Sequence, residues 1–467
     1  MTFRPAPSLV AIALAEWTDP AVVFAGGPAR HPDAFWLDAS AGARAGHSYL
    51  GLGEPAAIDP VLATVLRHDA PRPVSDPGED AALPSGVGAF RGGYVGWFGY
   101  EWGAAHAGLG PEVATTPGPE VVTTPGPVVP PAAWLRVDAF VAFDHATQRV
   151  WAVAPAAQAA AWAERVRAWV RAGEAAASAD LQAPPKRIAT SGHTAGEHAD
   201  LVRACHDVIR AGDAYQLCLT TQFTVPAGPV PFDAPSVFAA LRASSPSHHA
   251  GFIRAAGATL LSASPEQFLG VADGRVQTKP IKGTRPRGSD ARADAALAAE
   301  LRASTKEQAE NVMIVDLMRN DLTRVCEPGS VRVDALLNVE TYAQVHQLVS
   351  TVSGQLRQGV SVSDLLAATF PAGSMTGAPK RSAMAHLGGL ERASRGIYAG
   401  CWGYIGFDGT VDLAMVIRTI ILHGDVATVG SGGGITSGSV VVEEVQEVGV
   451  KVRAPLAALG AAVPAGW

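Results

Sequence analysis

The chain has 467 residues, of which 48% are hydrophobic and 17% are charged, and its formal net charge is −7 at pH 7. This length exceeds one ordinary hydrophobic core, so we expect more than one lobe. The net charge is negative and the sequence contains no stripe of basic residues, which argues against a nucleic-acid partner. Fifty glycines and 34 prolines imply many turns, which excludes a plain helical bundle.

The first part of the chain, residues 1–173, is predicted to form a β-rich N-terminal lobe of short strands between turns. Residues 9–15 are apolar but short, and we interpret them as a first strand, not a signal peptide. Residues 35–38 and 134–143 have the aromatic and β-branched content of strands, and the glycine-dense segment 92–101 is interpreted as a bent core strand. No window is long enough to cross a membrane.

Residues 174–192 lose all periodicity and include two adjacent prolines, which predicts a linker between two lobes. The remaining residues, 193–467, are predicted to form the C-terminal catalytic domain. Helices are expected over 197–211 and 306–324, and a last helix is expected to begin at Glu443. Strands fill much of the rest without the regular alternation of a doubly wound sheet, so the predicted class is α/β of the α+β type.

The four cysteines are scattered along the chain and form no Cys-x-x-Cys motif. They are Cys205, Cys218, Cys326 and Cys401. Such cysteines are typical of ordinary thiols in a reducing compartment, so we expect a cytoplasmic protein.

Lys282 is the most informative single residue of the sequence. It follows Pro280, which stiffens the chain, and precedes Gly283, which lets the backbone approach a ligand. Desolvation can remove the charge of a lysine and so convert its ammonium group into an amine nucleophile. A solvated loop lysine is the alternative interpretation.

Two pairs of glutamates are spaced three residues apart on predicted helices, Glu307 with Glu310 and Glu444 with Glu447. This spacing places both carboxylates of a pair on one face of a helix. Oxygen ligands from two helices suit Mg²⁺, which also accepts oxygens from water and substrate. The alternative is that both pairs belong to solvated helix faces.

Three further features indicate an anionic ligand or proton transfer. The glycine run 430–434 precedes a helix and could present backbone N–H groups to a carboxylate, although a flexible turn fits equally well. Arg418 stands in an apolar stretch that we interpret as a strand, where a buried cation needs an anionic partner. His346 could donate a proton, or could be a core histidine with its hydrogen bonds satisfied.

Several blocks of the second lobe, taken together and in order, resemble the chorismate-utilising enzymes. The blocks are Ser264-Pro265-Glu266, Pro280-Ile281-Lys282-Gly283-Thr284, residues 309–321, residues 373–380 and Val416-Ile417-Arg418. The resemblance spans roughly residues 195 to 455 and is weaker in the first lobe. It implies a two-lobed fold like that of the anthranilate synthase large subunit, with large antiparallel sheets packed against helices.

The resemblance also implies a site for chorismate and a role for each matching residue. Glu310 and Glu447 correspond to Mg²⁺ ligands, with Glu307 and Glu444 in support. The residues implied to bind the substrate are Gly283, Thr284, Tyr398, Arg418, Gly433, Gly434 and Lys451. The residues implied to act in catalysis are Lys282, His346, Ser374 and Glu307.

Two positions distinguish the classes within this family. Members that use water have a lysine base on the strand where this chain has Gln216, and anthranilate synthases have alanine where it has Lys282. The resemblance is therefore to the aminodeoxychorismate synthases, which feed 4-aminobenzoate and folate synthesis. It implies that the lysine adds at C2 of chorismate and expels the C4 hydroxyl, and that ammonia then adds at C4 and releases the lysine.

No cysteine lies in a recognisable nucleophile motif. The resemblance therefore implies that a separate glutamine amidotransferase subunit supplies the ammonia. Two other functions stay open on the sequence. One is an anthranilate synthase large subunit, which aminates C2 and releases pyruvate. The other is a catalytically silent homologue that binds an aromatic acid.

Overall fold

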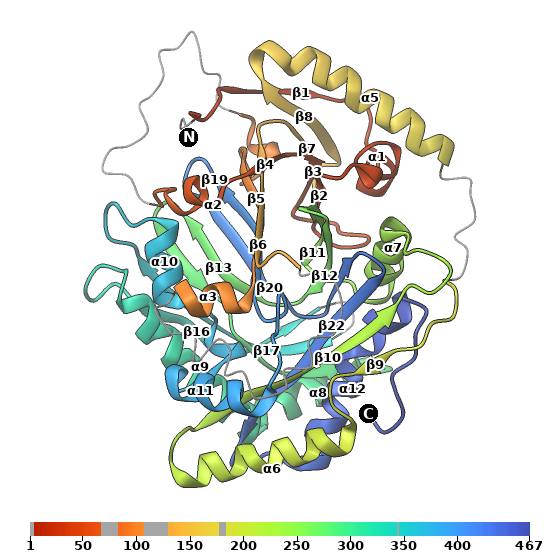
Figure 1. Ribbon diagram of the computed structural model, residues 1–467. Helices are drawn as coiled ribbons and strands as arrows, with labels where there is room; N and C mark the ends of the chain where they lie inside the picture. The colour runs from red at the N-terminus through yellow and green to blue at the C-terminus, as the bar shows by residue number, and fades with distance from the viewer. Residues whose placement is uncertain (1–3, 67–82, 107–128, 177–183, 343–344) are drawn as a thin grey trace.

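The computed structural model describes residues 4–66, 83–106, 129–176, 184–342 and 345–467. Two large antiparallel sheets form its centre, one of 12 strands and one of 10. Figure 1 shows helix α5 (Ala159–Ala176) lying across β1 and β8 at one end, with α6, α9, α11 and α12 near the other. The described helices include none that is both long enough and apolar enough to cross a membrane.

The first sheet runs in a spatial order that differs from the order of the sequence. Its strands are, in order, β1 (Leu9–Ala13), β8 (Arg149–Pro155), β7 (Phe140–Asp144), β3 (His47–Leu52), β2 (Ala34–Asp38), β11 (His249–Ala255), β12 (Ala258–Ser264), β21 (Thr419–His423), β22 (Val426–Thr436), β10 (Gln216–Pro226) and β18 (Gly377–Ala378), with β9 (Thr190–Ser191) beside β10.

The second sheet mixes early and late strands in the same way. Its order is β15 (Ile281–Pro286), β17 (Val345–Gln355), β14 (Arg275–Thr278), β13 (Gln267–Ala272), β20 (Val411–Met415), β19 (Cys401–Gly406), β5 (Gly93–Phe98), β6 (Ala132–Val137) and β4 (Glu54–Ala56), with β16 (Arg332–Thr341) beside β17.

The helices cover the outer faces and the ends of these sheets. Besides α5 they are α1 (Pro20–Gly26), α2 (Ile58–Leu62), α3 (Tyr100–His106), α6 (Ala195–Ala211), α7 (Ala234–Ser244), α8 (Ala291–Ala303), α9 (Thr305–Thr323), α10 (Val362–Thr369), α11 (Lys380–Glu391) and α12 (Val441–Ala458). The expected helices over 197–211 and 306–324 are thus confirmed as α6 and α9.

Strands from the two ends of the chain pair directly within both sheets. β2 pairs with β11 in the first sheet, and β5 pairs with β19 in the second. Residues on both sides of the expected linker, 174–192, therefore share each sheet, and residues 177–183 of that linker lie outside the described part of the chain. The two halves of the sequence consequently depend on each other for their β structure.

The core between the sheets is aromatic and fully buried. Phe35, Trp97 and Phe140 have no exposed surface, and Trp402 has 2%. Burying one such side chain contributes about 1.5–3 kcal/mol relative to leaving it in water. This aromatic core holds the first lobe against the sheet that carries the candidate site.

Two strand predictions from the sequence need correction. Residues 134–143 form two strands, β6 and β7, because the chain turns at 138–139 and passes from one sheet to the other. The glycine-dense segment 92–101 forms β5 and then the start of α3. Its glycines allow close approach, since a Cβ at Gly96 would lie 2.1 Å from the carbonyl oxygen of Ala133.

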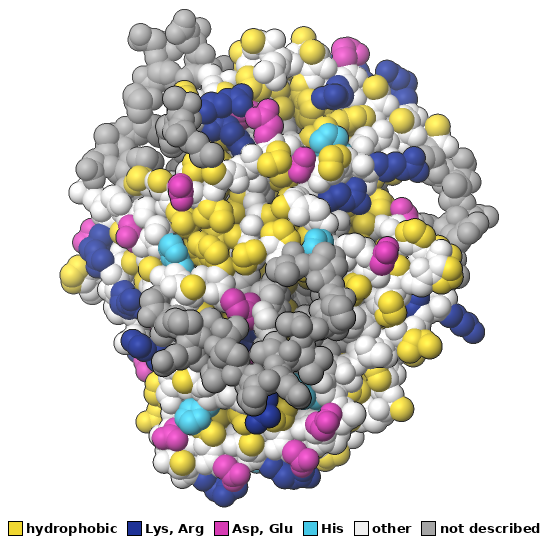
Figure 2. Space-filling model, in the orientation of Figure 1, with side chains coloured by type: hydrophobic (Ala, Val, Ile, Leu, Met, Phe, Trp, Pro, Cys, Tyr) yellow, Lys and Arg dark blue, Asp and Glu magenta, His cyan; other side chains and the backbone are white. Residues whose placement is uncertain are grey.

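The face shown in Figure 2 has basic and acidic side chains interspersed, and neither sign of charge gathers into a stripe. All four cysteines are buried and free of disulfides.

We predict opposite effects for two glycine-to-alanine substitutions. Gly389 is exposed in α11 and a Cβ there would meet nothing within 4 Å, so Gly389→Ala should stabilise the fold by about 0.5–1 kcal/mol. Gly96→Ala should destabilise it, because the added atom collides with backbone. Thermal and denaturant unfolding of both variants would test this, and a stable Gly96→Ala protein would contradict the packing of β5 against β6.

Candidate active site

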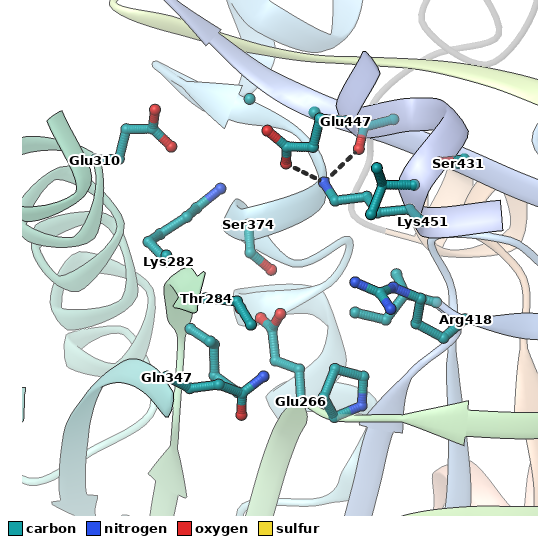
Figure 3. Close-up of a pocket in the computed structure, with 18 of the residues that line it drawn as sticks. Glu266, Lys282, Thr284, Glu310, Gln347, Ser374, Arg418, Ser431, Glu447 and Lys451 are labelled. Atoms are coloured by element: carbon teal, nitrogen blue, oxygen red, sulfur yellow. Dashed lines mark hydrogen bonds and ion pairs between the residues drawn. The ribbon is translucent and has the colours of Figure 1, made fainter. Parts of the chain in front are cut away.

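One cavity of about 470 Å³ opens where the glycine-rich strand β22 and β15 face helices α9 and α12 (Figure 3). Every site residue predicted from the sequence lines this cavity except His346. The lining set includes Lys282, Gly283, Thr284, Glu307, Glu310, Ser374, Tyr398, Arg418, Gly433, Gly434, Glu444, Glu447 and Lys451. Residues separated by up to 169 positions along the chain thus meet in one place.

Lys282 enters the cavity because β15 contains a bulge. Ile281 pairs with Val349 of β17 and Thr284 pairs with Gln347, so the register shifts between them. A bulge re-aims the side chain next to it. Gly283 makes the bulge possible through its φ of 85° and through its small size, because a Cβ there would lie 3.0 Å from the Glu307 carboxylate.

The charge of Lys282 is set by competing effects. Burial lowers the pKa of its amine, but the nearby carboxylates of Glu310, Glu266 and Glu447 outweigh burial, and the pKa is raised. Without ligand the group is therefore an ammonium ion at neutral pH. Burial, which the sequence argument invoked to remove this charge, is therefore not sufficient in this structure, because the carboxylates must first be offset.

Three of the four predicted metal-binding glutamates are paired with cations. Lys306 Nζ lies 3.0 Å from Glu444 Oε1. Lys451 Nζ lies 2.6 Å from Glu447 Oε1 and donates to the carbonyl oxygen of Gly432 at 2.7 Å. Glu307 is 3.6 Å from Arg285.

Glu310 differs from the other three glutamates. It has no ion pair within 4 Å in the described part of the chain, and burial raises its pKa to about 7. It extends from α9 toward the space beside Lys282 (Figure 3). A carboxylate buried without its own cation is a favourable ligand for a cation that arrives from outside.

The donor set of the cavity fits a hard divalent cation in its chemistry. Glu310 and Glu447 come from different helices and lie on either side of Lys282 in Figure 3. All the candidate ligands offer oxygen, as Mg²⁺ prefers. As the side chains stand, no three acidic, histidine or cysteine groups of the described residues are close enough to share an ion. A bound ion would compete with Lys306 and Lys451 for their carboxylates.

Arg418 provides a second positive charge of the cavity, besides Lys282, that has no ion pair among the described residues. It lies in the turn between β20 and β21, not within a strand as predicted, and has a φ of 52°. A non-glycine residue in this conformation is strained, and such strain is commonly found at ligand sites. Its guanidinium points into the cavity and has no carboxylate within ion-pair distance among the described residues. An anionic ligand would satisfy it.

The glycine run 430–434 is part of strand β22, where we had considered an anion-binding loop before a helix. Leu219 and Cys218 of β10 pair with Gly433 and Gly434. Because these glycines have no side chains, they leave space for the side chains that line the cavity. A Cβ at Gly430 would lie 2.0 Å from the Tyr398 ring, and one at Gly434 would lie 3.3 Å from Lys282 Nζ.

Ser374 is held in place by a buried ion pair behind it. It lies in a short turn, Gly373–Met375, and its hydroxyl points toward Glu266 in Figure 3. Arg395 pairs with Glu391 and donates to the carbonyl oxygens of Met375 (2.7 Å) and Cys218 (2.8 Å). This guanidinium therefore ties the turn to β10 and keeps the wall of the cavity rigid.

His346 faces away from the cavity, which corrects its placement in the sequence analysis. Its Nε2 lies 2.9 Å from Asp294 Oδ1, and its Nδ1 lies 2.8 Å from the hydroxyl of Thr341. Successive side chains of a strand point to opposite faces, so the next residue, Gln347, lines the cavity instead. The geometry gives no support for substrate contact by His346.

Glu266 is a site residue to which the sequence analysis assigned no role. It follows β12, is 7% exposed and points into the cavity beside Gln347 and Thr284. Burial raises its pKa to about 7, so near neutral pH it exists in both the protonated and the ionised form. The sequence signal was present in Ser264-Pro265-Glu266, a block that we used only for the resemblance.

The cavity thus combines carboxylates on two helices with an arginine that has no ion pair among the described residues. Residues 56–457 match the family described as chorismate binding enzyme, which is more than half of the chain. The chain belongs to the chorismate binding enzyme family.

Particular relatives lie in two classes of this family. The aminodeoxychorismate synthase of Streptomyces pristinaespiralis is 40% identical over 382 residues, which are 79% of this chain and 51% of the relative. Anthranilate synthase component 1 of Streptomyces coelicolor is 38% identical over 439 residues, 90% of this chain and 81% of the relative. The chain thus spans about half the length of the Streptomyces aminodeoxychorismate synthases that it matches.

A solved structure confirms the predicted fold. The crystal structure of anthranilate synthase component I from Streptococcus pneumoniae TIGR4 superposes with a TM-score of 0.68 at 27% sequence identity. The match covers 97% of this chain and 93% of that one. The α+β class and the likeness to the anthranilate synthase large subunit, both expected from the sequence, are therefore correct.

We predict that Glu266 makes the stability of the protein depend on pH. The folded state binds the proton more tightly than the unfolded chain, so stability falls as pH rises from about 4.5 to about 7. The loss by pH 8 should be about 3 kcal/mol, at about 1.4 kcal/mol per pH unit. Glu266→Gln should remove this loss.

The measurement is denaturant unfolding of wild type and Glu266→Gln at pH 5 and pH 8. The variant should gain stability relative to wild type at the higher pH. The same substitution at the exposed Glu174 of α5 should show no such gain. A difference that does not change with pH would mean that Glu266 is ionised in the folded protein.

Proposed function

We propose that the chain aminates chorismate at C4 to give 4-amino-4-deoxychorismate. The observation that carries this proposal is the amine of Lys282 inside the cavity, placed there by the bulge in β15. The aminodeoxychorismate synthase relatives, 38–46% identical over the matched segments, support it.

The proposed reaction uses Lys282 as a nucleophile. In its neutral form its amine forms a bond to C2, the two conjugated double bonds of the ring each shift by one position toward C4, and the bond from C4 to the hydroxyl oxygen breaks. Glu266 is the acid whose pKa is raised to about 7, and we propose that its proton leaves with the hydroxyl as water. Ammonia then forms the bond to C4, and the bond between C2 and Lys282 breaks.

Anion binding is assigned to the cations and glycines of the cavity. We propose that Arg418, Tyr398 and Lys451, with the backbone of Gly433 and Gly434, hold the enolpyruvyl carboxylate. In the proposed site Glu310 and Glu447, with Glu307 and Glu444 in support, would hold Mg²⁺. The ion would supply positive charge for the ring carboxylate and would offset the carboxylates beside the reacting amine. The chain's own part is to orient the substrate and to exclude water.

The proposal includes a partner and a place in metabolism. Ammonia is supplied by a glutamine amidotransferase subunit, and the product feeds 4-aminobenzoate and folate synthesis. Buried, unpaired thiols are consistent with a cytoplasmic location.

A second candidate is anthranilate synthase component I activity. It is favoured by the Streptomyces coelicolor relative, which matches over most of both chains. The two reactions differ in whether pyruvate is released. A silent homologue that only binds an aromatic acid is less consistent with the intact set of lysine, arginine and glutamates.

We predict that the purified chain, given chorismate, Mg²⁺ and ammonium, makes an aminated product that keeps its enolpyruvyl group. Lys282→Ala should lower this rate by about 100-fold or more, on the scale of losing one positioned catalytic group. Mass spectrometry of the product and a pyruvate assay would measure both. Lys279→Ala, which removes a nearby lysine outside the cavity lining, is the matched control.

Two outcomes would contradict this function. Anthranilate with an equal amount of pyruvate would establish the second candidate. Full activity of Lys282→Ala would remove the covalent route.

We predict that Glu310→Gln raises the Mg²⁺ concentration needed for half-maximal turnover by about 10-fold or more. The substitution removes one negative charge from the proposed ligands while keeping the shape of the side chain. Titration of chorismate turnover with Mg²⁺ would measure it. Glu443→Gln, an exposed residue of α12 outside the cavity lining, should leave the requirement unchanged, and an equal shift in both variants would argue against a metal ligand at Glu310.

A further inference from the structure

We propose that Asp294 of α8 is a positioning residue for Lys282, because it anchors the strand that carries this lysine to the neighbouring strand. Asp294 does not line the cavity, so it acts through β15 and not by touching the substrate. The inference rests on the proposed function, in which Lys282 is the nucleophile, and adds a residue that neither the motifs nor the cavity lining identifies.

The strand that carries Lys282 has limited support within its sheet. Among the described strands β15 pairs with β17 alone, and the bulge between Ile281 and Thr284 interrupts this ladder. A bulge leaves a residue unpaired and bends its strand. Beyond the bulge only Thr284 and the two residues that follow pair with β17, and the last of them, Pro286, has no N–H to donate. The position of the bulge therefore depends on how the end of β15 is anchored.

Asp294 provides that anchor through both of its carboxylate oxygens. Arg287, the residue after β15, donates from Nε to Oδ1 at 2.7 Å and from Nη2 to Oδ2 at 2.8 Å. The N–H of Gly288 donates to Oδ1 at 2.8 Å, and Nε2 of His346 in β17 lies 2.9 Å from the same oxygen. One carboxylate thus joins the end of β15 to the beginning of β17.

The surroundings of this carboxylate keep it charged and in place. Hydrogen bonds from Arg287 and Gly288 lower the pKa of Asp294, so it is ionised at neutral pH and its bonds to the guanidinium are charge-assisted. Arg287 also donates to the carbonyl oxygen of Tyr342, just after β16, at 2.8 Å. Gly288 allows the close approach, since a Cβ there would lie 2.1 Å from the backbone nitrogen of Asp294.

This anchor is separate from the cations proposed to hold the substrate. Arg418 lies between β20 and β21, and Lys451 lies in α12, so neither belongs to β15 or α8. A loosened β15 would therefore misplace the amine of Lys282 while the carboxylate of the substrate stays bound. A displacement of about 1 Å at a reacting group can cost about 100-fold in rate. Loss of Asp294 should accordingly lower turnover more than it lowers affinity.

The test compares Asp294→Ala with Asp290→Ala in the full chain with Mg²⁺. Asp290 is the N-cap of the same helix and accepts from the N–H groups of Arg292 and Ala293, so its loss weakens α8 without removing the anchor. Asp294→Ala should lower kcat for chorismate amination by about 10-fold or more and leave the Kd of chorismate, measured by calorimetry, within about 3-fold.

Hydrogen exchange supplies a readout that does not depend on turnover. Asp294→Ala should speed the exchange of the amides of residues 281–285, and Asp290→Ala should change neither this exchange nor kcat. Asp294→Asn keeps an acceptor for Gly288 and His346 but loses the charge. It is the second variant if the alanine protein fails to fold, and it should show the same changes in a weaker form.

Three results would overturn the role of Asp294. They are an unchanged kcat in Asp294→Ala, a fall in kcat of the same size in Asp290→Ala, and a loss of chorismate affinity as large as the loss of kcat. Failure of the proposed function is distinguishable, because it would appear as anthranilate and pyruvate from the wild type, or as full activity of Lys282→Ala. Neither of these results depends on Asp294.

Discussion

The site depends on one balance of charge, between the ammonium of Lys282 and the carboxylates that surround it. Burial alone would favour the neutral amine, but Glu310, Glu266 and Glu447 hold the proton on it. Lys306 and Lys451 in turn form ion pairs with two glutamates of α12, Glu444 and Glu447. A cation bound in this cavity would lower the pKa of the lysine, and an anion bound alone would raise it.

The sheets explain how such a site stays in place. Strands from the C-terminal part of the chain pair with strands from the N-terminal part in both sheets. The sheets that form the cavity walls therefore pack around an aromatic core to which both lobes contribute. Behind the cavity, the buried pair of Arg395 and Glu391 joins β10 to the turn that carries Ser374. Rigid walls of this kind keep catalytic groups within the narrow tolerances that transition states require.

Much of the site could be predicted because its residues occur in short local patterns. The spacing of Glu307 and Glu310 on a helix placed both on one face, and α9 bears this out. The sequence-based predictions failed where they had to assign the direction in which one particular side chain points. His346 and Gln347 are neighbours on one strand, and nothing in their local sequence shows which of them faces inward. Arg418 was expected in a strand, but it lies in a strained turn at the end of one.

The sequence by itself determined the family, the residue types of the site and the helices that carry the glutamates, because these depend on local spacing and on ordered motifs. Only the tertiary structure decided that the pKa of Lys282 is raised, that the pKa of Glu266 is raised to about 7, and that Gln347 lines the cavity. The physical reason is that a pKa and a side-chain direction depend on groups that are distant in the sequence.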